Sequence, residues 1–228
     1  MNQQAPHYSI EKLVIERTVE FAMQRPEASP VHLPALLVAL HGYGQNCGRF
    51  MRVFASLRKK NILVVAPQAP NEFYVKMNPP VVGYTWLTRY ERDRSITEFL
   101  AYMQRMLEKI QSMHPFDPDR VNFLGFSQGV SMAYRFAIAE VHQTAGVIAC
   151  GADLPPDVHA KLPTATPFRT FLVHGTEDTV VPLTKAKEAY IQLKKQGLPV
   201  EHFFFPGGHE VPVEAVEKIG SWITSQAG

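Results

Sequence analysis

The segment Gly125-Phe-Ser-Gln-Gly129 has the residue types and spacing of a serine nucleophile on a sharp turn. It follows an apolar run over residues 121–126 and precedes a helical pattern over residues 131–138. A strand-to-helix turn of this kind presents the serine hydroxyl above the edge of a sheet, and its flanking residues must be small because the two backbones nearly touch. The helix that follows directs its dipole and free N–H groups toward developing negative charge. We therefore predict that Ser127 is a nucleophile.

A serine hydroxyl needs an adjacent base, and the base needs an acid that orients it. In this type of fold the chain order is serine, acid, histidine. His209 lies in Pro206-Gly-Gly-His-Glu210, a glycine-rich segment between the last apolar run and the last helical pattern. Such a loop can bring an imidazole over the sheet, so we predict His209 as the base. Of the other candidates after Ser127, His142 falls at a helix end, His202 lies inside a strand and His174 fills a turn position.

The acid is expected after a late strand. Glu177 and Asp178 both follow the apolar run over residues 168–174, and spacing alone does not separate them. Asp153 and Asp157, which follow the preceding run, are alternatives.

Hydrolysis also requires backbone donors where the oxyanion forms. One should be the N–H of Gln128, directly after the nucleophile, and the other should come from the loop after the first buried strand. That loop is Leu40-His-Gly-Tyr-Gly44, and its glycines allow the backbone to approach a substrate carbonyl. Its position points to the N–H of Tyr43.

The elements that position these residues alternate along the chain. Short continuous apolar runs are typical of strands that are covered on both faces. These runs lie at 35–40, 62–66, 121–126, 145–150, 168–173 and 200–205. Apolar and polar residues alternate in patches over 10–23, which suggests edge strands or a hairpin. Apolar residues at helical spacing begin at Phe50 and again near Ser95, and they recur at 184–195 and 213–225. We predict a three-layer α/β-hydrolase fold with a mainly parallel sheet and helices on both faces, as one domain over residues 1–228.

A long connection over about residues 67–94 shows little periodicity. Loops of this length in compact domains are often functional. Aromatic side chains on it could line a pocket for an apolar group, or they could pin the loop to the surface: Phe73, Tyr74, Tyr84 and Trp86.

Composition restricts the partners and the compartment. The formal net charge is only +2, which gives no electrostatic reason to expect nucleic acid or an anionic membrane. Cys47 and Cys150 cannot form a disulfide framework for a chain of 228 residues, which favours a reducing compartment. No signal peptide or membrane-spanning run is visible. We expect a cytoplasmic protein without integral membrane contact, and the oligomeric state, including a homodimer, is open.

Five segments together resemble the phospholipase/carboxylesterase family, the group that includes acyl-protein thioesterases. They run in family order from about residue 36 to the C-terminus: Leu40-His-Gly-Tyr-Gly44, Pro67-Gln-Ala-Pro70, Gly125-Phe-Ser-Gln-Gly129, His174-Gly-Thr-Glu-Asp-Thr-Val-Val-Pro182 and Gly207-Gly-His209. The resemblance implies a compact α/β hydrolase with little or no lid, no metal and no organic cofactor. It also implies that the catalytic aspartate is Asp178, not Glu177, and it agrees with Tyr43 and Gln128 as oxyanion donors.

Two departures from the family pattern bear on the substrate. Familiar thioesterase members tend to carry an aspartate where this chain has Gln45, and an aromatic residue and then Asp where Leu87 and Thr88 follow Trp86. These positions lie near the expected acyl and leaving-group sites, so acyl-protein and lysophospholipid substrates are less favoured. We predict a serine carboxylesterase that cleaves short- to medium-chain esters, with thioesters also considered, through an acyl-enzyme. The alternatives are an acyltransferase that uses the same acyl-enzyme and a binding protein on a hydrolase scaffold.

Overall fold

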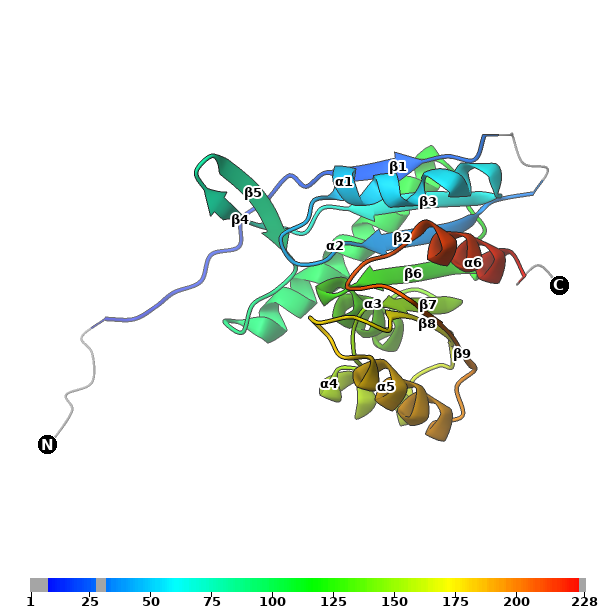
Figure 1. Ribbon diagram of the computed structural model, residues 1–228. Helices are drawn as coiled ribbons and strands as arrows, with labels where there is room; N and C mark the ends of the chain where they lie inside the picture. Colours follow the sequence, from blue (N-terminus) through cyan, green and yellow to red (C-terminus); the bar gives the residue numbers. More distant parts are fainter. Residues whose placement is uncertain (1–7, 28–31, 226–228) are drawn as a thin grey trace, which may run out of the picture.

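A seven-stranded sheet forms the centre of the protein (Figure 1). The computed structural model describes residues 8–27 and 32–225. The strand order is β1-β3-β2-β6-β7-β8-β9, in which β1 is antiparallel to β3 and all other neighbours are parallel. The strands are β1 (Phe21–Gln24), β2 (Ala35–Leu40), β3 (Ile62–Pro67), β6 (Val121–Phe126), β7 (Gly146–Cys150), β8 (Arg169–Gly175) and β9 (Val200–Phe205).

The central strands are buried on both faces, which explains their continuous apolar sequences. Every residue of β2 is buried, yet successive side chains belong to different cores because side chains alternate along a strand. Leu36, Val38 and Leu40 join one core, whereas Leu37 and Ala39 join the other. The predicted runs therefore correspond to the strands of a mainly parallel sheet.

Helices cover both faces of this sheet (Figure 1). The 3-10 helix η1 (Arg52–Lys59) follows α1 (Cys47–Met51) and packs against α6 (Val213–Thr224), and all three lie on one face. The opposite face holds α2 (Arg92–Met113), α3 (Gln128–Ala139), α4 (Pro156–His159) and α5 (Leu183–Lys195), and short 3-10 turns occur at η2 (Pro118–Arg120) and η3 (Leu162–Thr164). The three layers match the predicted architecture.

The connection between β3 and α2 differs from the prediction. It contains a two-stranded antiparallel hairpin, β4 (Asn71–Met77) and β5 (Pro80–Thr85), where the sequence indicated a loop without periodicity. The hairpin projects beyond the carboxyl edge of the main sheet (Figure 1). Most of its residues are exposed, so it lacks the apolar run that made the central strands recognisable.

The first part of the chain also differs from the alternating pattern. Only β1 forms a strand there, and residues 8–20 contain no regular element. They run outward from β1 (Figure 1), and on the way Arg17 pairs with Glu72 of the hairpin and Lys12 pairs with Glu91. Apolar side chains of this segment are exposed, including Leu13 and Val14. No helix within the described ranges is both long and apolar enough to cross a membrane.

Candidate active site

The predicted nucleophile, acid and base all follow strands of the parallel sheet at its carboxyl edge. Ser127 comes directly after β6, Asp178 after β8 and His209 after β9. Crevices at the carboxyl ends of strands are the usual ligand sites of open α/β sheets. Residues far apart in the chain therefore meet at one edge.

Ser127 occupies a strained turn between β6 and α3. Its backbone has φ 52° and ψ −119°, a region that residues with side chains rarely adopt. A Cβ atom at Gly125 would lie 2.3 Å from Val130 Cα, and one at Gly129 would lie 2.2 Å from the carbonyl oxygen of Leu40. The glycines of the motif are thus required by direct backbone contact, as the sequence predicted.

Asp178 and His209 form a short hydrogen-bonded pair, with Asp178 Oδ2 2.7 Å from His209 Nδ1. The Asp178 side chain is fully buried, and its other oxygen accepts hydrogen bonds of 2.8 Å from the N–H groups of Val180 and Val181. Burial by itself would raise the pKa of Asp178, but the hydrogen bonds from Val181, His209 and Val180 outweigh it and keep the pKa below its ordinary value. A carboxylate at this position accepts a hydrogen bond from Nδ1–H, which fixes the tautomer and leaves Nε2 of His209 free to act as a base.

The imidazole of His209 lies over the turn that carries Ser127. Its ring centroid is 4.8 Å from that of Phe126, and a Cβ atom at Gly151 would lie 3.2 Å from the imidazole Nδ1. The N–H of Ser127 donates to the carbonyl of Cys150, directly before Gly151. Within the described residues no hydrogen bond joins the Ser127 hydroxyl to His209, and such contacts often tighten only when substrate binds.

The alternative acids occupy different surroundings. Glu177 and Asp153 are exposed, whereas Asp157 binds Arg135 and Arg92 at 2.8–3.0 Å. Burial opposes ionisation of Asp157, but hydrogen bonding to Arg135 and the two guanidinium charges outweigh it and lower the pKa of this carboxyl. Asp157 therefore has structural partners of its own.

The predicted oxyanion loop lies against the nucleophile. A Cβ atom at Gly42 would be 3.3 Å from Cβ of Ser127, so the loop after β2 approaches the serine closely. The N–H groups of Tyr43 and Gln128 donate to no other residue in the described part of the chain. Neither N–H group is therefore committed to an acceptor among the described residues, as the predicted role requires.

Comparison with known proteins identifies the family. A family model described as Phospholipase/Carboxylesterase matches residues 25–226, nearly the whole chain. The chain belongs to this family. It is accordingly an enzyme of the carboxylic ester hydrolase class, of the esterase and thioesterase type.

Solved structures confirm the α/β-hydrolase fold. Esterase PE8 has a TM-score of 0.70 and 22% identity, with 92% of this chain and 99% of that chain covered. Acyl-protein thioesterase 2 of Zea mays has a TM-score of 0.67 and 18% identity, with 92% and 99% covered. The carboxylesterase of Bacillus cereus has a TM-score of 0.66 and 16% identity, with 91% and 94% covered. At these identities the likeness concerns the fold.

The structure reveals supporting residues of this family member that the sequence reasoning missed. His41 is completely buried, and its Nδ1 donates to the carbonyl of Gly42 at 2.8 Å. Its Nε2 accepts from the N–H of Ala69 and from Gln68 Nε2, each at 3.1 Å. Burial lowers the pKa of His41 to about 4, so the imidazole is neutral near pH 7. His41 lies in the motif Leu40-His-Gly-Tyr-Gly44 and Gln68 lies in Pro67-Gln-Ala-Pro70, so the resemblance to the family could have drawn attention to both residues.

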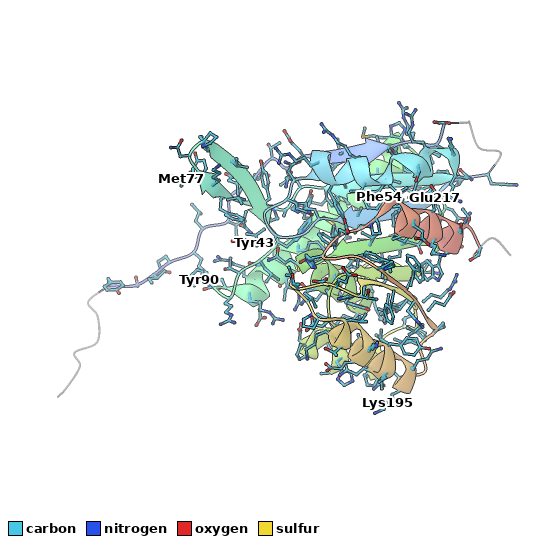
Figure 2. All side chains as sticks on the ribbon, viewed as in Figure 1. Tyr43, Phe54, Met77, Tyr90, Lys195 and Glu217 are labelled. Atoms are coloured by element: carbon cyan, nitrogen blue, oxygen red, sulfur yellow. The ribbon has the colours of Figure 1, made fainter. Side chains whose placement is uncertain are left out.

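The four predicted pocket residues fall into two groups. Phe73 contacts Tyr43 with 4.7 Å between ring centroids and an angle of 32° between the ring planes, Tyr74 is 58% exposed, and the carbonyl of Tyr84 accepts from Gly44 N–H. Figure 2 shows Tyr43 near the base of the hairpin and Met77 at its tip. Trp86 differs because it is 0% exposed and binds the His41 carbonyl, which makes it a buried support of the loop after β2 instead of an open pocket wall.

Two further features of the molecule bear on ligand binding. The described residues include no group of three or more His, Cys, Asp or Glu side chains that could hold a metal ion. A hollow of about 650 Å³ lies between β9 and α6, lined by residues such as Phe203, Lys218 and Trp222. It contains none of the predicted site residues, so we assign the chemistry to the sheet edge and not to this hollow.

Proposed function

We propose that this enzyme hydrolyses short- to medium-chain carboxylic esters, and thioesters as a second class, through Ser127, His209 and Asp178. The observation that carries the proposal is the 2.7 Å contact between buried Asp178 and His209 beside the positive-φ turn of Ser127. A buried carboxylate that fixes the imidazole tautomer and a hydroxyl on a strained turn are the parts that acyl transfer to serine requires.

In the first step, Nε2 of His209 accepts the Ser127 proton while Oγ attacks the ester carbonyl. Asp178 stabilises the imidazolium, and the N–H groups of Tyr43 and Gln128 donate to the oxyanion. The C–O bond to the alcohol then breaks, and His209 returns the proton to the departing oxygen. The acyl group is now held on Ser127.

In the second step, water attacks the acyl-enzyme. His209 takes a proton from the water, the tetrahedral intermediate collapses, and the proton returns to Ser127 as the acid leaves. The aromatic residues Phe73, Tyr74 and Tyr84 of the hairpin are proposed to contact the acyl group, since apolar surface near the serine favours an apolar chain.

The test is hydrolysis of p-nitrophenyl acetate and butyrate by Ser127→Ala. We expect the activity to fall by at least about 10³-fold, because the nucleophile and its acyl-enzyme are lost. Ser131→Ala, one turn further along α3, is the matched control and should keep the parent rate. A fluorophosphonate should label Ser127 of the parent, as detected by peptide mass spectrometry. Ester turnover within a few-fold of the parent in Ser127→Ala would refute the proposal.

Substrate range is tested with p-nitrophenyl esters of increasing acyl length. We expect kcat/KM to peak at short to medium chains and the peak to move when Phe73 is changed to Ala. An added alcohol tests whether the acyl group passes to an acceptor other than water. Ester products that exceed free acid would identify an acyltransferase instead.

We further propose a reducing, cytoplasmic setting for the enzyme. Cys47 and Cys150 are both free and buried, and burial raises the pKa of each thiol. Buried neutral thiols neither cross-link nor react readily. Equal esterase activity with and without a thiol reductant is expected from purified protein.

A further inference from the structure

The two proposed oxyanion donors lie on different elements, and a single segment contacts both. Tyr43 belongs to the loop after β2, whereas Gln128 is the first residue of α3. Catalytic groups must be held within about 0.5 Å of the productive geometry. The segment from Thr85 to Leu87, at the end of β5, reaches both elements through hydrogen bonds.

On one side, this segment binds the side-chain amide of Gln128. Gln128 Oε1 accepts from the N–H of Trp86 at 3.0 Å, and Gln128 Nε2 donates to the carbonyl of Leu87 at 2.9 Å. Gln128 Nε2 also lies 2.9 Å from Thr85 Oγ1, which itself donates to the Leu87 carbonyl at 3.0 Å. The amide is therefore bonded at both its oxygen and its nitrogen, and its orientation is determined.

On the other side, the segment binds the oxyanion loop. Trp86 Nε1 donates to the carbonyl of His41 at 2.8 Å, two residues before Tyr43. The indole is 0% exposed, lies 5.1 Å from the His41 ring and meets Phe99 edge-on at 5.6 Å. A ring packed on two sides has little freedom, so its N–H position is fixed by the core.

We propose that Trp86 and the side chain of Gln128 are positioning residues that set the separation of the two oxyanion donors. Trp86 bridges them because its backbone N–H holds Gln128 and its indole N–H holds His41. The inference rests on the proposed function, since it concerns the same donors. Neither the indole nor the Gln128 amide group is assigned contact with the reacting atoms.

The first test is Trp86→Phe, which keeps an aromatic ring in the core but removes the indole N–H. We expect kcat for p-nitrophenyl butyrate to fall about tenfold to a hundredfold, because a misplaced donor weakens binding of the transition state. KM should stay within about threefold of the parent value. The affinity for a trifluoromethyl ketone, which forms an oxyanion on Ser127, should fall by the same factor as kcat.

Trp222→Phe is the matched control. Trp222 lies on α6, is 6% exposed, and its indole N–H also donates a 2.8 Å hydrogen bond, to Glu201. A purely structural loss of an indole hydrogen bond would lower the thermal midpoint in both variants without changing kcat of the folded enzyme. We expect only Trp86→Phe to change kcat and inhibitor affinity.

Gln128→Met provides a second route if Trp86→Phe does not fold. Methionine has a similar volume but cannot form the hydrogen bonds of the Gln128 side-chain amide. We again expect kcat and inhibitor affinity to fall by the same factor. In the double variant the losses should be smaller than the product of the single losses, because the two substitutions break the two ends of one bridge between the donors. An unchanged kcat in folded Trp86→Phe or Gln128→Met, or a loss of kcat without loss of inhibitor affinity, overturns the inference. Activity retained by Ser127→Ala would instead overturn the proposed function, so the two failures are distinguishable.

Discussion

At the scale of single residues, the surroundings of two adjacent carboxylates decide which one can orient an imidazole. Glu177 is exposed, whereas the Asp178 side chain is fully buried between two backbone N–H groups and His209. Those donors favour the charged form and point one oxygen at Nδ1. The difference arises from the turn after β8, not from the chemistry of the side chains.

Asp178→Asn should lower kcat by about 10³- to 10⁴-fold, because an amide no longer holds the imidazole tautomer or stabilises its charge. The neighbouring Glu177→Gln removes the same charge from an exposed position and should leave kcat within about twofold. Steady-state kinetics with p-nitrophenyl butyrate compares the two. Equal effects of both substitutions would contradict the assignment of Asp178.

His41 makes folding stability depend on pH. Its pKa is about 4 in the folded protein and about 6.5 in the unfolded chain, so between these values the unfolded state binds more protons. The contribution is complete above about pH 6.5 and is lost as the pH falls toward 4. The total is about 3 kcal/mol.

Urea unfolding of the parent and of His41→Gln from pH 7.5 to 4.5 measures this contribution. The glutamine oxygen can accept in place of Nε2 but does not titrate, so we expect a flatter stability curve for the variant over this range. Parallel curves for the two proteins would show that His41 does not account for the dependence.

At the scale of elements, the contact between α3 and the end of β2 couples the nucleophile to the oxyanion loop. The helix begins so close to β2 that a Cβ atom at Gly129 would lie 2.2 Å from the Leu40 carbonyl oxygen and 2.9 Å from that of His41. The loop that carries Tyr43 starts at these carbonyls. We therefore expect a displacement of α3 to move the proposed oxyanion donors.

Gly129→Ala should destabilise the protein by about 1–3 kcal/mol and lower kcat at least tenfold, because backbone must move to admit the methyl group. Gly48→Ala is the control, since in α1 the nearest atom to the new Cβ is 3.7 Å away. Thermal unfolding and ester hydrolysis are the measurements. A Gly129→Ala enzyme with parent kcat and stability would show that the contact yields without consequence.

At the scale of the whole molecule, ion pairs connect three helices, α2, α3 and α4, on one face of the sheet. Asp157 of α4 accepts from Arg135 of α3 and from Arg92 at the start of α2. The Arg135 side chain is only 6% exposed, so loss of its partner leaves a largely buried charge. This cluster stabilises the helix that follows the nucleophile although it lies outside the proposed chemistry.

Asp157→Asn should lower the free energy of unfolding by about 1–3 kcal/mol, a range reduced because the Asp157 side chain is 35% exposed. The lowered pKa of Asp157 means that its contribution is present above the unfolded value near 4 and is lost as the pH falls through the folded value. Glu98→Gln, which breaks an exposed pair with Arg94 at 3.7 Å, should change stability by less than about 0.5 kcal/mol. Equal losses in urea unfolding would contradict the role of the buried guanidinium.

Local patterns in the sequence were enough to predict the layers and the elements that carry the candidate site. Burial on both faces leaves a continuous apolar run, as in β2, and helical packing leaves a period of 3.6, as in α2. Glycines at 125 and 129 were interpretable because a strand and its own following helix meet within a few residues. Each of these patterns can be read from residues that are close together in the chain.

Tertiary structure decided the features that depend on contacts between distant segments. Trp86 was predicted as a pocket residue, but its indole is buried against the carbonyl of His41, 45 residues away. The β4–β5 hairpin was missed because its mostly exposed strands carry no core pattern. Spacing left Glu177 and Asp178 as equal candidates, and only the fold brings His209 to one of them. Amino-acid types limit which contacts are chemically possible, but burial and distance select among them once the whole chain has packed.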